Sequence, residues 1–387
     1  MSETPSHESS QHADIVIIGA GAIGLALAAT LAGPRSVAVL ERHVSFGRET
    51  SSHGSGVIHA GLYYPPDWLK TRLCTEGNQL LYRWAQTYLV RHARTGKLVL
   101  AVQQDELPAL ERLHAGAQAN GVPDLQMLSA VDLHSLEPDV RAAGALFSSS
   151  SGIISPLELL ASYVEAAHER GAITAFSSEV VHIERRAGGF RIVTTMPQGE
   201  MTIWQAETLI NAAGLWADYV GALAGYDPDG DEHHPPFRQT VNRGRYYELT
   251  NRRATSGVKH LLYPLPPADR SGLGVHLTLD LDGNARLGPD TQWLPTGSRL
   301  DYTAEDDRRD EFLAAAQRYL PSLTAGDLAP GKLGYRPKLS GPGEPARDFL
   351  IWQHEGYVHL GGMESPGLTA SLAIASYVGE MLGLKTA

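Results

Sequence analysis

The apolar positions near the start of the chain predict a strand, a helix and a second strand. Asp14–Ile18 is typical of a buried strand, Ala22–Ala32 of a helix and Val37–Leu40 of a second buried strand. This order within about 30 residues is a βαβ unit. The uncharged run 15–33 is also long enough for a membrane helix, but its glycines favour the strand, turn and helix.

The same patterns continue along the rest of the chain. Helices are predicted at Leu69–Arg91, Leu107–Asn120, Leu157–Arg170, Ala304–Tyr319 and Thr369–Leu384. Strands are predicted at Leu98–Val102, Ala145–Phe147, Gly152–Ile154, Ala172–Ala175, Glu179–Arg185, Phe190–Thr195, Met201–Gln205, Thr208–Ala212 and Tyr357–Leu360. From Pro235 to Leu287, β-rich runs alternate with turns such as Asp282-Gly283-Asn284, which is typical of an antiparallel sheet.

A glycine motif lies between the first strand and the first helix. Gly19-Ala20-Gly21-Ala22-Ile23-Gly24 opens the helix, and Glu41 ends the second strand 17 residues after Gly24. Such glycines let backbone approach a pyrophosphate, the helix N-terminus supplies N–H donors, and the acidic residue binds ribose hydroxyls. The motif predicts a dinucleotide site without separating FAD from NAD. A ligand-free glycine turn is the alternative.

Two further glycine turns each lie between a predicted strand and a helix. Asn211-Ala212-Ala213-Gly214 follows one strand, and Gly361-Gly362-Met363 leads toward the last helix through Glu364–Thr369. If that helix N-terminus faced a flavin ring, its dipole would stabilise negative charge on the reduced flavin. Ordinary strand–helix turns are the alternative for both.

Composition narrows the function classes. The 387 residues are 43% apolar and 19% charged, enough for a full core in two or three domains. One cysteine, Cys74, excludes an intrachain disulfide and a cysteine-ligated zinc; we expect it to be a buried apolar residue, and no metal site. The net charge of −11 argues against nucleic-acid binding, so an anionic substrate would need local cations.

The element order predicts a mixed α/β (α+β) fold of two interleaved domains. A Rossmann-like cofactor domain is expected from residues 13–95, 150–230 and 335–387, and an antiparallel-sheet substrate domain from residues 96–149 and 231–334. Residues 1–12 are polar and resemble a disordered tail rather than a signal peptide. We therefore expect a cytoplasmic location, with at most peripheral contact at the inner face of a membrane.

Motifs along nearly the whole chain after residue 13 resemble the D-amino-acid oxidase superfamily of flavoenzymes, and within it the L-2-hydroxyglutarate dehydrogenase/oxidase branch. The matching segments are Ser51–Pro65, Leu73–Gly77, Arg243–Tyr247, Gly274–Thr278, Arg336–Pro342 and Glu364–Leu372. Flavin-linked glycerol-3-phosphate dehydrogenases share the Ile-His-Ala/Gly-Gly pattern found near His59. The branch usually has Asn where this chain has Gly54, which weakens the substrate assignment.

The resemblance implies FAD as cofactor, a small anionic substrate, and an electron acceptor that is oxygen, a quinone or an electron-transfer protein. The residues expected at the FAD are Gly19, Ala20, Gly21, Ile23, Gly24, Glu41, Arg42, Ser51, Ser52, Ser55, Gly56, Val181, Ala213, Gly214, Gly362, Ser365, Pro366, Gly367, Leu368 and Thr369. A covalent flavin link through Cys74 has no support in the sequence.

Oxidation of a 2-hydroxy acid needs a base for the hydroxyl proton and a cation for the carboxylate. The resemblance places His59 and His276 at the active site; the sequence leaves open which is the base, with a slight preference for His276. Arg336, just before Pro337, matches the carboxylate-binding arginine of the superfamily. Lys338, Tyr246 and Tyr63 are further candidates for substrate binding. Tyr246 and Tyr247 should face opposite sides of a strand.

The function expected from these residues is oxidation of a small 2-hydroxy acid, L-2-hydroxyglutarate to 2-oxoglutarate, by hydride transfer to flavin N5. The alternatives within the superfamily are oxidation of glycerol 3-phosphate and oxidation of an amino acid or amine. A non-catalytic FAD-binding protein and an NAD-dependent dehydrogenase are the alternatives outside it.

Overall fold

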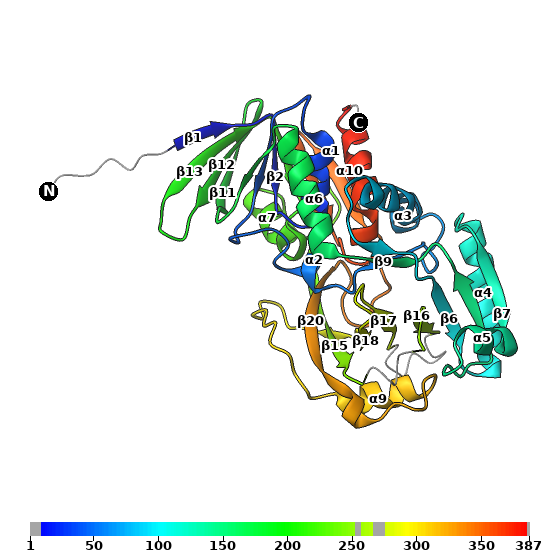
Figure 1. Cartoon of the computed structure of the whole chain (residues 1–387). Coiled ribbons are helices and arrows are strands. Elements are labelled where there is room, and N and C mark those ends of the chain that lie inside the picture. The colour runs from blue at the N-terminus through cyan, green and yellow to red at the C-terminus, as the bar shows by residue number, and fades with distance from the viewer. Residues whose placement is uncertain (1–8, 252–256, 266–274, 385–387) are drawn as a thin grey trace.

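The computed structural model describes residues 9–251, 257–265 and 275–384 (Figure 1). The helices of this part are α1 (Ala22–Leu31), α2 (Thr50–His53), α3 (Leu69–Thr87), α4 (Leu107–Ala119), α5 (Ala130–Leu136), α6 (Pro156–Glu169), α7 (Ala217–Leu223), α9 (Arg309–Gln317) and α10 (Gly367–Met381). None of them is long and apolar enough to cross a membrane.

A six-stranded sheet forms the centre of the cofactor-binding part. Its spatial order is β10 (Ile173–Ala175), β3 (Val37–Leu40), β2 (Ile15–Ile18), β14 (Thr208–Asn211), β22 (Tyr357–Gly361) and β21 (Leu350–His354). All neighbours are parallel except β21 and β22. Because parallel strands need crossovers that cover both faces, apolar runs such as β2 are the sequence signature of this sheet.

The side chains of β2 show the layers on either side. Ile15 and Ile17 pack in a core with α1, α3, α6 and α10, which stand beside the sheet in Figure 1. Val16 and Ile18 pack on the other face, against α7 and a four-stranded sheet. That sheet has the order β1 (Ser9–His12), β13 (Met201–Ala206), β12 (Gly189–Thr195) and β11 (Glu179–Arg186).

The prediction of a disordered tail over residues 1–12 is wrong for its last four residues. Ser9–His12 form β1, which pairs in parallel with β13. Backbone hydrogen bonds hold this polar edge strand, so no apolar pattern marks it in the sequence. Residues 1–8 lie outside the described residues.

A nine-stranded sheet forms the second part, in the lower half of Figure 1. Its order is β19 (Gln292–Trp293), β15 (Thr240–Leu249), β18 (Ala285–Leu287), β17 (Leu277–Leu279), β16 (Leu261–Pro264), β6 (Lys97–Ala101), β8 (Gly144–Ser148) and β7 (Leu125–Ser129), with β20 (Leu328–Lys338) also paired with β15. The pairs are antiparallel except β16 with β6, as the turn-rich sequence predicts. A small sheet of β4 (Val57–Ile58), β9 (Gly152–Ile154) and β5 (His92–Ala93) completes the described strands.

The two large sheets take strands from alternating stretches of the chain, which confirms the mixed, interleaved fold class. The domain limits stay a proposal, and β20 runs across the limit proposed between residues 334 and 335. Some helix ends differ from the prediction: α3 ends at Thr87 rather than Arg91, and α9 begins at Arg309 rather than Ala304. The sequence patterns also missed α5 and β7.

Candidate active site

Two neighbouring cavities border the glycine turn: the smaller lies within the cofactor-binding part, and the larger lies where that part meets the nine-stranded sheet. The smaller, of about 120 Å³, opens beside the ends of β2 and β3, and the larger has about 600 Å³. Their walls share the residues Gly21, Thr50, Ser51, Ala212 and Gly214. One elongated ligand can therefore occupy both cavities, with its middle at the glycine turn.

The shared wall has the features of a phosphate site. Helix α1 begins after Gly21, has no acidic side chain in its first turn, and donates the Ala22 amide to the Ser51 hydroxyl at 3.0 Å. Gly21 has φ −85°, a backbone conformation that any residue can adopt. A glycine here therefore keeps the groove open rather than permitting a special backbone conformation. The positive end of α1 thus faces a groove that a diphosphate fits.

Glu41 is buried in the wall of the smaller cavity. Its carboxylate accepts the Ala20 amide at one oxygen and the His43 amide at the other, each at 2.8 Å. A carboxylate has about four acceptor positions, so capacity remains for a hydroxyl in the cavity. Its placement fits the predicted ribose contact.

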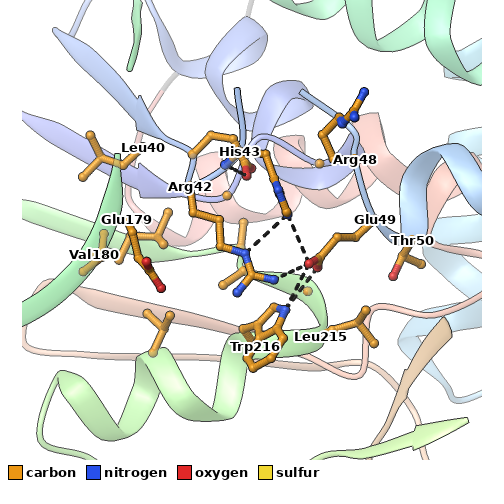
Figure 2. A pocket seen from close by; sticks show the side chains of 18 of the residues that line it. Leu40, Arg42, His43, Arg48, Glu49, Thr50, Glu179, Val180, Leu215 and Trp216 are labelled. Carbon is orange, nitrogen blue, oxygen red and sulfur yellow. Dashed lines mark hydrogen bonds and ion pairs between the residues drawn. The ribbon is translucent and has the colours of Figure 1, made fainter. Parts of the chain in front are cut away.

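The outer wall of the smaller cavity is a charged and aromatic cluster (Figure 2). Arg42 pairs with Glu49, and its guanidinium lies 4.3 Å from the centre of the Trp216 ring. The Glu49 carboxylate also accepts the Trp216 indole N–H at 3.1 Å. Arg42 lines the cavity with its charge already paired, and its contact with FAD stays a prediction.

The N-terminus of α10 forms one wall of the larger cavity. Ser365, Pro366, Gly367 and Leu368 all line it, and α10 carries no acidic residue in its first turn. A helix of this length directs a positive dipole end at whatever occupies the wall. This arrangement suits an isoalloxazine ring that gains negative charge on reduction.

His59 contacts both the N-terminal region of α10 and Lys97, the first residue of β6 in the nine-stranded sheet. Its backbone N–H donates to the Thr369 hydroxyl at 3.0 Å, its ring Nε2 lies 3.2 Å from Ser365 Oγ, and its ring Nδ1 lies 3.4 Å from Lys97 Nζ. Burial, and then the neighbouring charge of Lys97, hold the pKa of His59 well below its usual range. The ring is therefore neutral and can accept a proton.

His276 lines the same cavity from the opposite sheet. It immediately precedes β17 rather than lying within a strand, and its ring stacks on Tyr263 with 3.7 Å between centroids. Burial, with the charges of Lys97 and Arg336, lowers the pKa of His276 to about 3. The two predicted histidines thus face one space.

Arg336 projects from β20 into the larger cavity. Its NH1 donates to Asn242 Oδ1 at 2.5 Å, and its NH2 donates to the Asp290 carbonyl at 2.8 Å. These bonds hold the guanidinium in one orientation and leave some of its five N–H donors for a ligand. A pre-oriented arginine of this kind suits a carboxylate.

Two lysines share one carboxylate at another part of the cavity wall. Glu364 accepts from Lys70 Nζ at 3.0 Å and from Lys338 Nζ at 2.6 Å. Lys338 lines the cavity, and Glu364 balances part of its charge, so its contact with substrate stays a prediction. The group carries a net charge of about +1 beside Arg336.

Of the two tyrosines predicted to bind substrate, Tyr246 lines the larger cavity and Tyr63 does not. Tyr246 lines the cavity while Tyr247 is fully buried in the core of the nine-stranded sheet, which confirms that the pair faces opposite sides. Tyr63 is 41% exposed and lines neither cavity, whereas the neighbouring Tyr64 lines the larger one, so the substrate contact of Tyr63 stays a prediction.

The predicted cofactor residues lie partly at the cavities and partly behind their walls. Those that line one or both cavities are Gly19, Gly21, Ile23, Glu41, Arg42, Ser51, Ser55, Gly56, Ala213, Gly214, Ser365, Pro366, Gly367 and Leu368. Those that line neither cavity are Ala20, Gly24, Ser52, Val181, Gly362 and Thr369. Some of the second group make structural contacts instead: the Thr369 hydroxyl accepts from the His59 amide, and the Gly362 amide donates to Gln239.

Val181 is displaced by a bulge. The pairing of β11 with β12 shifts register between Val180 and His182, so Val180 lines the smaller cavity and the Val181 side chain is exposed. An extra residue in a strand reverses which side chains face inward. Alternating patterns cannot reveal such a shift.

Sequence reasoning missed Lys97, Tyr263, Lys70 and Glu364. A lysine at the head of the apolar run Leu98–Ala101 was the one available signal for Lys97. Gly54, where the branch usually has Asn, also lines the cavity, and a Cβ there would meet nothing nearer than the Thr50 carbonyl at 3.9 Å. A side chain at this position would fit.

Comparison with known proteins agrees with this geometry. The family model described as FAD dependent oxidoreductase matches residues 14–381. The mitochondrial L-2-hydroxyglutarate dehydrogenase of Arabidopsis thaliana is 35% identical over 95% of this chain and 83% of its own, and the glycerol 3-phosphate dehydrogenase of Caloramator mitchellensis is 30% identical over 95% and 73%.

A solved structure shows the same fold with cofactor. The L-alpha-glycerophosphate oxidase of Mycoplasma pneumoniae with FAD bound has a TM-score of 0.80 and 27% identity, covering 97% of this chain and 96% of its own. The glycine turn, the buried Glu41 and the two joined cavities fit that cofactor. The chain therefore belongs to the family of FAD-dependent oxidoreductases.

Proposed function

We propose that the protein oxidises a small 2-hydroxy acid, L-2-hydroxyglutarate, to the 2-oxo acid. The observation that carries the proposal is one cavity in which the Arg336 guanidinium faces the same space as two neutral histidines, His59 and His276. Arginine binds a carboxylate through two parallel hydrogen bonds, and a neutral imidazole accepts a hydroxyl proton. Bound FAD supplies the acceptor for the hydride.

The cationic residues of the cavity are assigned to binding the substrate carboxylates, and one histidine is assigned to proton transfer. Arg336 holds the C1 carboxylate, which orients the C2 carbon. Lys338 and Lys70 offer the distal carboxylate a cationic wall, shared with Glu364. His59 takes the hydroxyl proton, because its Nε2 faces the α10 wall and its Nδ1 has the Lys97 amine beside it. This assignment replaces the slight preference for His276, whose stacking on Tyr263 suits a role in shaping the site.

Glycerol 3-phosphate is the second candidate substrate. It is favoured by the 30% identity to a glycerol 3-phosphate dehydrogenase, and the same cations would suit its phosphate. The test is bleaching of the bound flavin, without oxygen, by L-2-hydroxyglutarate, glycerol 3-phosphate and glycine in parallel. We expect L-2-hydroxyglutarate to reduce the flavin fastest. Bleaching by glycerol 3-phosphate alone would assign the other substrate. Reoxidation by oxygen, a quinone and an electron-transfer protein then compares the acceptors.

Arg336→Ala is expected to weaken binding of L-2-hydroxyglutarate about 10- to 100-fold, because charged hydrogen bonds contribute about 1.5–3 kcal/mol. Misplacement of C2 should also slow reduction. Arg336→Lys should recover part of the loss, since an ammonium cannot form the planar fork. The rate of anaerobic flavin reduction, measured over a range of substrate concentrations, gives both the apparent affinity and the maximal rate of reduction. Arg141→Ala, an exposed arginine outside both cavity walls, is the control. If the flavin-reduction rate of Arg336→Ala depended on substrate concentration as in the wild type, Arg336 would not be the residue that binds the carboxylate.

A further inference from the structure

Lys97 is a lysine buried in an unusual place. It begins β6, its side chain is fully buried, and it does not line either cavity. Among the ion pairs of the described residues, none joins Lys97 to a carboxylate. An ammonium without such a partner is costly to bury, so burial favours the uncharged amine.

The neighbours of Lys97 come from several elements. Its Nζ lies 3.4 Å from His59 Nδ1 and 4.1 Å from the centre of the Tyr263 ring. The titratable groups that face it are His59, Tyr63, Cys74 of α3, Tyr263 of β16 and His276. Burial raises the pKa of the Cys74 thiol to about 12, so no anion is formed there near neutral pH.

We propose that Lys97 is a positioning residue that decides which nitrogen of His59 carries the proton: as a neutral amine it accepts the Nδ1 hydrogen and leaves Nε2 unprotonated. Nε2 then accepts from the Ser365 hydroxyl until the substrate hydroxyl takes that place and gives up its proton. As an ammonium, Lys97 donates to Nδ1 instead, and Nε2 then carries the hydrogen and cannot act as the base. The inference rests on the proposed function for the identity of the proton donor.

The proton and electrons balance in this arrangement. The substrate O–H bond breaks as an N–H bond forms at His59 Nε2, and the electron pair of the C2–H bond leaves with its hydrogen to FAD, the oxidant. The Nδ1 hydrogen of His59 can then pass to the Lys97 amine, which leaves the imidazole neutral and places the positive charge on lysine. No further reactant is needed.

The switch should be visible near neutral pH, because burial lowers the pKa of Lys97 to about 7. Below that pH Lys97 is an ammonium, which holds His59 in the tautomer that cannot act as the base. The rate of anaerobic flavin reduction should therefore rise with pH. We expect about a tenfold rise between pH 6 and pH 8 in the wild-type holoenzyme.

Three variants separate this role from packing. Lys97→Met keeps a side chain of similar length without the amine, and its rate of flavin reduction should no longer increase near pH 7. Lys97→Arg keeps the charge at every pH and should hold the rate near the acid level of the wild type. Lys332→Met is the matched control: burial lowers the pKa of Lys332 to about 8, but its ammonium donates to the Gly54 carbonyl rather than to a histidine. The rise should persist in that variant. The same rise in Lys97→Met would overturn the proposal.

A second measurement does not depend on the substrate. Nitrogen-15 NMR of histidine-labelled holoenzyme reports which ring nitrogen of His59 is protonated, with His59→Gln assigning the signal. We expect the hydrogen to move from Nε2 to Nδ1 as the pH rises from 6 to 8, and no such movement in Lys97→Met. A His59 signal with no tautomer change in the wild type would refute the role of Lys97. Absence of bleaching by L-2-hydroxyglutarate with this tautomer change intact would refute the substrate alone.

Discussion

His59→Gln is expected to slow anaerobic reduction of the flavin by L-2-hydroxyglutarate by about 10²- to 10⁴-fold, the usual contribution of a general base. Glutamine is close to histidine in size and can still contact Ser365, but it cannot take a proton. Substrate binding should change little, since Arg336 and the lysines remain. The rate at saturating substrate and the concentration for half-maximal rate, measured by rapid mixing, separate the two effects.

His276→Gln is the matched comparison for this prediction. His276 lines the same cavity and stacks on Tyr263, and no hydrogen bond among the described residues joins its ring to an amine as Lys97 Nζ is joined to His59. We expect its loss to weaken substrate binding more than it slows the saturated rate. The assignment of the base would be reversed if His276→Gln lost the saturated rate while His59→Gln stayed within about threefold of wild type.

Gly21→Val is expected to yield a folded protein without FAD. Gly21 lines both cavities at their junction, and its backbone conformation is open to any residue. An added Cβ would lie 3.2 Å from the Ser51 hydroxyl, and the valine methyls would occupy the groove at the start of α1. The flavin absorbance per protein, with circular dichroism for the fold, measures the result.

Gly116→Val controls for the substitution itself. Gly116 lies on the exposed side of α4, and a Cβ there would meet nothing within 4 Å. This variant should keep full flavin content. Gly19 is a poorer choice for the test because its φ is +106° and a Cβ would lie 2.6 Å from the Ala212 carbonyl, so a side chain would disturb the fold. Full occupancy of FAD in Gly21→Val would contradict the placement of the diphosphate.

The parts of the fold that local patterns predict best are those buried on both faces. Strand β3 has the predicted limits, and β2 and α1 agree within one residue, because their apolar runs and glycine turn are unambiguous. Strand β1 escaped prediction because its partner, β13, lies about 190 residues away and backbone pairing needs no apolar side chain.

The candidate site shows the same limit. Alternation along one strand separates Tyr246 from Tyr247, but the bulge at Val181 and the inward placement of Tyr64 rather than Tyr63 depend on backbone geometry that one sequence does not display. The place of Lys97 beside His59 arises from contact between separate elements. Motifs therefore identified the cofactor and pointed to Arg336 as the proposed clamp, whereas packing was needed to find what surrounds the proposed base.

The cationic wall around Arg336 has a kinetic consequence, because it lies within a chain of net charge −11. At long range the whole protein repels an anion, and at physiological ionic strength salt screens charges beyond about 8 Å. The proposed contact between the substrate carboxylate and Arg336 would be short, and Arg336 is partly buried, so salt should weaken it less. Added salt should therefore speed association of a dianionic substrate while leaving its dissociation nearly unchanged, the reverse of enzymes whose net charge attracts their substrate.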